Sequence, residues 1–124
     1  MQQFKLTNKT LDFELSYGSY QIYFTGGWYI KNLEELEIEL IDVVTKKEII
    51  LRSKKFFGLR KQDIIGKQKA VLAYEFDVLK YSKLRITINN PEILILKKMH
   101  PFMWMHSLLF PKDVALETIL VVIK

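Results

Sequence analysis

The chain has 124 residues, with 19 Lys and Arg against 14 Asp and Glu, giving a formal net charge of +5. Hydrophobic residues make up 49% of it, which argues against a disordered chain, and the absence of cysteine excludes disulfide frameworks, thiolate nucleophiles and zinc ribbons. This length predicts one domain that spans residues 1–124.

Apolar and polar residues alternate along most of the chain, which is the pattern of half-buried β-strands. Gly26-Gly27 lies between aromatic and β-branched residues and predicts a tight hairpin or a bulge. In the N-terminal part, the alternation predicts strands near residues 4–6, 11–15, 22–24 and 28–30, with a turn at 17–20.

The stretch from Asn32 to Thr45 is ambiguous. Asn32 followed by Glu35 resembles a helical capping box, and leucines in this stretch also fall on one helical stripe. Against a helix, apolar residues alternate strictly with glutamates, and the stretch ends in β-branched residues. We therefore predict a strand here.

The C-terminal part continues the pattern. Residues 48–51 are expected to form a hairpin with the preceding strand, and 64–65 are a short apolar piece of a lysine-rich connector. Further strands are predicted at 71–78, 84–88, 93–96 and 119–123. The phrases around 13–24 and 74–88 look alike and each suggests a hairpin. The whole predicts an all-β fold, a single antiparallel β-sandwich or partly open barrel of about eight or nine strands.

The sequence offers few groups for metal binding or nucleophilic catalysis. His100 and His106 are the only histidines, whereas a zinc site needs three or four ligands. We interpret both as residues of a hydrophobic loop. The glycine pair is not followed by the helix and lysine of a phosphate-binding loop. We expect no enzyme, no metal and no cofactor.

Two pairs of carboxylates leave a minor alternative open. Asp12 with Glu14, and Glu75 with Asp77, each share a strand face at a separation of roughly 6–7 Å. Such pairs occur in glycosidases, and they also occur on any solvated strand face. A small hydrolase using Glu75 and Asp77, or a carbohydrate-binding module using aromatics near Trp28-Tyr29, is therefore a minor hypothesis.

The positive charge is concentrated in one segment. Residues 46–69 contain nine basic and two acidic residues, a charge of +7, so the remaining ten basic and twelve acidic residues give −2. Basic residues beside aromatics suit single-stranded nucleic acid or an anionic membrane surface. The alternative hypothesis is thus an anionic-ligand binder whose basic patch comprises Arg52, Lys54, Lys55, Arg60, Lys61, Lys67 and Lys69.

Residues 99–111 form the second unusual stretch. It is apolar, lacks alternation, lies largely between Pro101 and Pro111, and holds three of the four methionines. Methionine and aromatic side chains together make an adaptable contact surface when they are exposed, although a core crossover is the alternative. The candidate partner-binding residues are Phe102, Met103, Trp104, Met105, Leu109 and Phe110.

These observations predict a non-catalytic interaction module that binds a protein partner, in an accessory, assembly or immunity-type role. A sheet edge could also pair with its copy, so a homodimer is expected to be feasible. The first residues lack the apolar core of a secretory signal and no run of 18 apolar residues occurs. We expect a cytoplasmic protein, or a periplasmic or secreted one if a signal has been removed, and no transmembrane segment.

Urea denaturation of Trp104→Ala tests whether the apolar stretch is a contact surface. Loss of an exposed side chain should change the free energy of unfolding by less than about 0.5 kcal/mol. A cost of about 3–5 kcal/mol, typical of a deleted core aromatic, would instead place Trp104 in the core.

Overall fold

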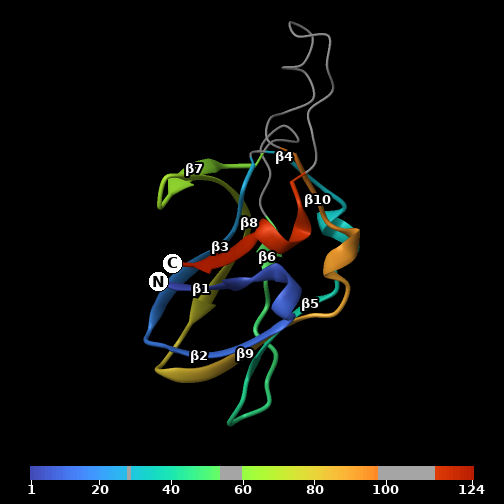
Figure 1. Ribbon diagram of the computed structural model, residues 1–124. Coiled ribbons are helices and arrows are strands. Elements are labelled where there is room, and N and C mark those ends of the chain that lie inside the picture. Colours follow the sequence, from blue (N-terminus) through green and yellow to red (C-terminus); the bar gives the residue numbers. More distant parts are fainter. Residues whose placement is uncertain (28, 54–59, 98–113) are drawn as a thin grey trace, which may run out of the picture.

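The computed structural model describes residues 1–27, 29–53, 60–97 and 114–124 (Figure 1). Within these ranges the chain is all-β and antiparallel, which confirms the predicted β-sandwich-like fold class. The strands are β1 (Gln2–Lys5), β2 (Thr10–Leu15), β3 (Gly18–Thr25), β4 (Tyr29–Lys31), β5 (Ile38–Asp42), β6 (Arg52–Ser53), β7 (Gln62–Ile65), β8 (Gln68–Val78), β9 (Ser82–Ile88), β10 (Ile95–Lys97) and β11 (Leu120–Ile123). Short 3₁₀ helices occupy Leu6–Asn8, Leu33–Glu35, Pro91–Ile93 and Leu116–Thr118.

Two main sheets share the strands. The larger has the order β1-β11-β3-β8-β6, with β7 also paired to β8, and the smaller has the order β2-β9-β5. β4 and β10 form a separate pair. The two chain ends lie side by side because β1 pairs with β11, from Gln2 opposite Ile123 to Lys5 opposite Leu120 (Figure 1).

The two sheets are joined by a bent ribbon. β2 pairs with β9 from Thr10 opposite Thr87 to Leu15 opposite Ser82. β2 continues into β3, and β8 continues into β9, through a short turn in each case. Beyond these turns the two segments pair again, as β3 with β8, beginning at Gly18 opposite Val78. The prediction of two separate hairpins is therefore wrong. Alternation defines which face of a strand is buried, but it does not identify the partner, and here each strand pairs with a distant one.

The main core lies between the inner faces of the two sheets. Its fully buried members include side chains from β3, β5, β8, β9 and β11, among them Phe24, Leu40, Phe76, Leu84, Ile86 and Val121. A second, smaller cluster uses the alternate residues of the large sheet: Tyr23, Ile65, Ala70, Leu72 and Val122. The middle of β8 is consequently buried on both faces, which explains its continuous apolar run.

The ambiguous stretch from Asn32 is a strand only in its second half. Leu33–Glu35 forms a 3₁₀ helix, and β5 follows as the strand that was predicted. Asn32 does not act as a helix cap, because its side chain makes no capping bond and its amide donates to the carbonyl oxygen of Ile93 at 2.9 Å. Leu33 and Leu36, three residues apart, are both buried by this single turn.

Three other segments differ from their predicted structure. The connector at 62–65 is a strand, β7, which forms a hairpin with β8. Residues 48–51 are not a regular hairpin partner, because only Glu48 forms a bridge, opposite Ile41. Similarly, the predicted strand at 93–96 begins in a 3₁₀ helix and becomes β10 only at Ile95. Of these segments, β10 pairs with a strand remote in sequence, β4, through Ile95 opposite Lys31.

The hairpin between β7 and β8 provides a test of this local geometry. Its two turn residues, Gly66 and Lys67, have φ angles of 55° and 70°. A left-handed conformation costs a residue with a side chain roughly 1 kcal/mol relative to glycine. Lys67→Gly should therefore stabilise the protein by about that amount in chemical denaturation. The control Lys61→Gly removes the same charge at a position where φ is not positive, so it should not stabilise the protein. Equal changes in the free energy of unfolding for the two variants would contradict the left-handed conformation of Lys67.

Candidate functional site

The predicted partner-binding residues Phe102, Met103, Trp104, Met105, Leu109 and Phe110 lie outside the described residues, as do Lys54, Lys55, His100, His106 and Trp28. The candidate surface at 99–111 therefore stays a prediction. The described members of the basic patch fall into two groups. Lys61 and Lys67 are exposed and Lys69 is half-buried, whereas both arginines make ion pairs within the domain.

The side chain of Arg60 has a structural role within the domain. Its side chain is only 5% exposed, and its Nη1 donates to Ser53 Oγ at 2.8 Å and to the carbonyl oxygen of Ala73 at 3.3 Å. Nη2 lies 3.7 Å from Glu34 Oε1. Burial lowers the pKa of Arg60 and raises the pKa of nearby Tyr74 to about 12. Arg60 is thus unsuited to contact an external phosphate.

One carboxylate of each predicted pair, Asp12 and Asp77, is held in a surface ion pair. Asp12 accepts bonds from Arg85 at 2.7 and 3.0 Å, and this arginine lowers the pKa of Asp12. Asp77 accepts from Ser19 Oγ at 2.8 Å and from Arg52 Nη1 at 3.1 Å. The bond from Ser19 is the larger cause of the lowered pKa of Asp77. A general acid requires a raised pKa, whereas the pKa values of Asp12 and Asp77 are lowered.

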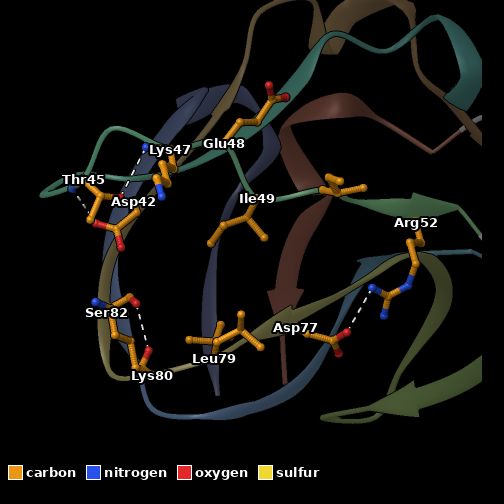
Figure 2. A pocket seen from close by; sticks show the side chains of 12 residues that line it. Asp42, Thr45, Lys47, Glu48, Ile49, Arg52, Asp77, Leu79, Lys80 and Ser82 are labelled. Carbon is orange, nitrogen blue, oxygen red and sulfur yellow. Dashed lines mark hydrogen bonds and ion pairs between the residues drawn. The ribbon is translucent and has the colours of Figure 1, made fainter.

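A cleft with a volume of about 500 Å³ opens where the edges of the two sheets meet (Figure 2). One wall comes from the end of β5 and the chain that follows it, and the other from the end of β8 and its turn into β9. The lining residues are Asp42, Thr45, Lys47, Glu48, Ile49, Ile50, Arg52, Asp77, Val78, Leu79, Lys80 and Ser82.

The cleft exists because one stretch of chain pairs first with one sheet and then with the other. Glu48 forms a bridge with Ile41 of β5, and the amide of Ile49 donates to the carbonyl oxygen of Leu40 at 2.8 Å. β6 begins four residues after Glu48 and pairs with β8 through Arg52 opposite Glu75. Between Ile49 and Arg52 the chain therefore crosses from the small sheet to the large one, and the cleft lies between this crossing and the end of β8.

Most acidic groups of the cleft are engaged within the domain. Asp42 Oδ1 accepts the backbone amides of Val44 and Thr45 at 2.9 and 3.1 Å, and the bond from Thr45 is the main cause of the lowered pKa of Asp42. Asp77 is bonded to Ser19 and Arg52, as described above. The carboxylates therefore hold the walls of the cleft in place, and the surface left for an external molecule is largely apolar.

Large apolar side chains are exposed around this cleft. Ile50 is 76% exposed and Leu79 is 83% exposed, and both line it. Tyr17, Val44 and Tyr81, in the loops that follow β2, β5 and β8, are also exposed but do not line the cleft. Among the described residues, two of the seven exposed large apolar side chains, Ile50 and Leu79, thus line this one cleft. Grouped exposure of this kind marks interaction surfaces.

No pattern in the sequence predicted this cleft. The apolar run Ile49-Ile50-Leu51 predicts one strand, but Ile50 is exposed to solvent while Ile49 and Leu51 pack against the core. A detectable signal was Leu79-Lys80-Tyr81, a turn with two large apolar residues where polar ones are usual. The pairing that brings both segments together is not visible in the sequence.

Comparisons with known proteins found no matching family model, curated protein or solved structure. In the part of the chain that the structure describes, no helix is long and apolar enough to cross a membrane. The same residues contain no group of three or more His, Cys, Asp or Glu side chains that could hold a metal ion.

Substitution of neighbouring basic residues tests the structural role of Arg60. Arg60→Ala should lower the free energy of unfolding by about 2 kcal/mol, because it removes charge-assisted hydrogen bonds to Ser53 and Ala73. Lys61→Ala removes the same charge from an exposed side chain and should change it by less than about 0.5 kcal/mol. Equal and small effects in urea denaturation would show that Arg60 belongs to the solvated patch.

Proposed function

We propose that this protein is a non-catalytic interaction module that binds a protein partner, and that the cleft between β5 and β8 is its binding site. The observation that carries the proposal is the exposure of Ile50 and Leu79 on opposite walls of one cleft. A partner side chain that enters between them would remove apolar surface from water on both walls, which is the main favourable term in protein association.

The polar groups of the cleft support binding more than catalysis. A catalytic site needs a nucleophile or a base within reach of a reacting atom, with its pKa matched to the reaction. Asp42 and Asp77 instead accept bonds from the domain itself, and their pKa values are lowered. Fixed carboxylates with apolar side chains beside them resemble a binding surface with an apolar centre and a polar rim.

Selection from a phage library of linear peptides, about twelve residues long, tests the proposal without knowledge of the natural partner. Peptides that bind the wild-type protein at the cleft should lose affinity by about tenfold or more for Ile50→Glu and for Leu79→Glu, since each change places a charge against the apolar contact. Fluorescence anisotropy of labelled peptides gives the dissociation constants.

The matched control is Ile64→Glu. Ile64 is 56% exposed on β7 and does not line the cleft, so this variant has the same change of charge and should bind the peptides as the wild type does. Circular dichroism and thermal unfolding should show that all three variants are folded, because each residue is mostly exposed. Peptides insensitive to both cleft variants, or an empty selection, would contradict the proposed function.

A further inference from the structure

The edge of β8 that faces the cleft lacks a strand neighbour near its end. On one side, β3 accompanies β8 from Ala70 to Val78. On the other side, β7 pairs with the beginning of β8, and β6 pairs only with Tyr74 and Glu75. Within the described residues, no strand pairs with this second edge beyond Glu75. An open strand edge presents backbone amide and carbonyl groups that another strand can satisfy.

The geometry explains why the edge is open. If β6 continued backward in its own register, Leu51 would lie opposite Phe76, Ile50 opposite Asp77, and Ile49 opposite Val78. The chain does not follow this path, because the amide of Ile49 is bonded to Leu40 of β5. The cleft therefore occupies the position that the next residues of a strand would take.

We propose that the partner binds as an extended segment that adds a short strand to β8 beside Phe76–Val78. This inference rests on the proposed function and specifies how the partner is recognised. An added strand forms main-chain hydrogen bonds with the open edge, and the pockets along the edge select alternate side chains. The cleft volume of about 500 Å³ is within the range of sites that hold small ligands or a few side chains.

The faces of β8 define the chemistry of the bound segment. Phe76 and Val78 are buried and face the core, whereas Asp77 between them is exposed. Residues that face each other in paired strands lie on the same side of the sheet. The segment should therefore carry apolar side chains opposite Phe76 and Val78, where Ile49 lines the cleft. Lys or Arg should be favoured opposite Asp77, because the oxygens of this exposed carboxylate can accept further bonds beside those from Ser19 and Arg52, and opposite charges stabilise cross-strand pairs.

An N-methyl scan of a peptide selected as above tests the mode of binding. A methyl group on a peptide nitrogen removes its hydrogen-bond donor, and only every second amide of a strand points toward one neighbour. Strand addition predicts losses of about tenfold or more at alternate positions of the bound core, with small changes at the positions between them. A helical or irregular peptide would not show this period of two.

Asp77→Asn and Asp63→Asn form a matched pair for the side-chain prediction. Both carboxylates accept an ion pair from a basic residue, but Asp63 lies on β7 and does not line the cleft. Peptides with Lys or Arg at the central position should bind the Asp77→Asn variant more weakly than the wild type, and should bind the Asp63→Asn variant as well as the wild type. Replacing the central Lys or Arg of the peptide by Gln should abolish the difference between the two variants.

The outcomes separate the two proposals. Cleft-dependent binding with a period of two and sensitivity to Asp77 supports strand addition. Cleft-dependent binding without the period of two overturns strand addition and leaves the protein-binding function standing. Binding with the period but without sensitivity to Asp77 overturns the predicted cation. If no selected peptide depends on Ile50 or Leu79, both the function and the strand-addition mode are wrong.

Discussion

The structure depends on the pairing of β8, its longest described strand. β8 has eleven residues, and β3 pairs with one edge while β7 and β6 share the other. Its middle contributes side chains to the clusters on both faces of the large sheet. At its end the chain turns into β9, the central strand of the small sheet. A single stretch of chain thus supplies the centre of both sheets, so its burial fixes the position of the other strands.

The cleft follows from this arrangement. The two sheets are joined where β2 continues into β3 and β8 into β9, and the chain from β5 to β6 has to cross from the small sheet to the large one. The backbone bonds of Glu48 and Ile49 go to β5, and those of Arg52 and Ser53 go to β8, so neither pairing extends over the whole segment. Residues 48–53 pair briefly with each sheet instead. Because β6 pairs only with Tyr74 and Glu75, this edge of β8 is open beyond Glu75.

The sequence predicted the fold class and most of the long strands. Alternation in 11–15, 71–78 and 84–88 corresponds to β2, β8 and β9, because each buries one side against the core, or both sides in the middle of β8. It did not predict the pairing of β2 with β9, which joins residues more than 65 positions apart. Local composition also misassigned β7, since the charges around Ile65 concealed a strand that packs against Leu72.

The candidate site was harder to predict than the fold. Counting charges placed Arg60 with the exposed lysines, although its guanidinium is buried and bonded to Ser53 and Ala73. Composition reports the sign of a side chain but not its solvation, which depends on the strands that surround it. Ile50 and Leu79 lie 29 positions apart in the sequence, and only the crossing of the chain between the sheets brings them to one cleft.

Neither Ile50 nor Leu79 needs to be apolar for the protein to fold. Ile50 faces outward because Ile49 and Leu51 face the core, so a polar residue would satisfy the same alternation. Leu79 follows β8 in a turn and is 83% exposed. Single exposed apolar residues are common on protein surfaces. Here, however, two exposed apolar residues that folding does not require lie on facing walls of one cleft, beside an open strand edge. A contact with another chain explains this arrangement more readily than the packing of this chain does.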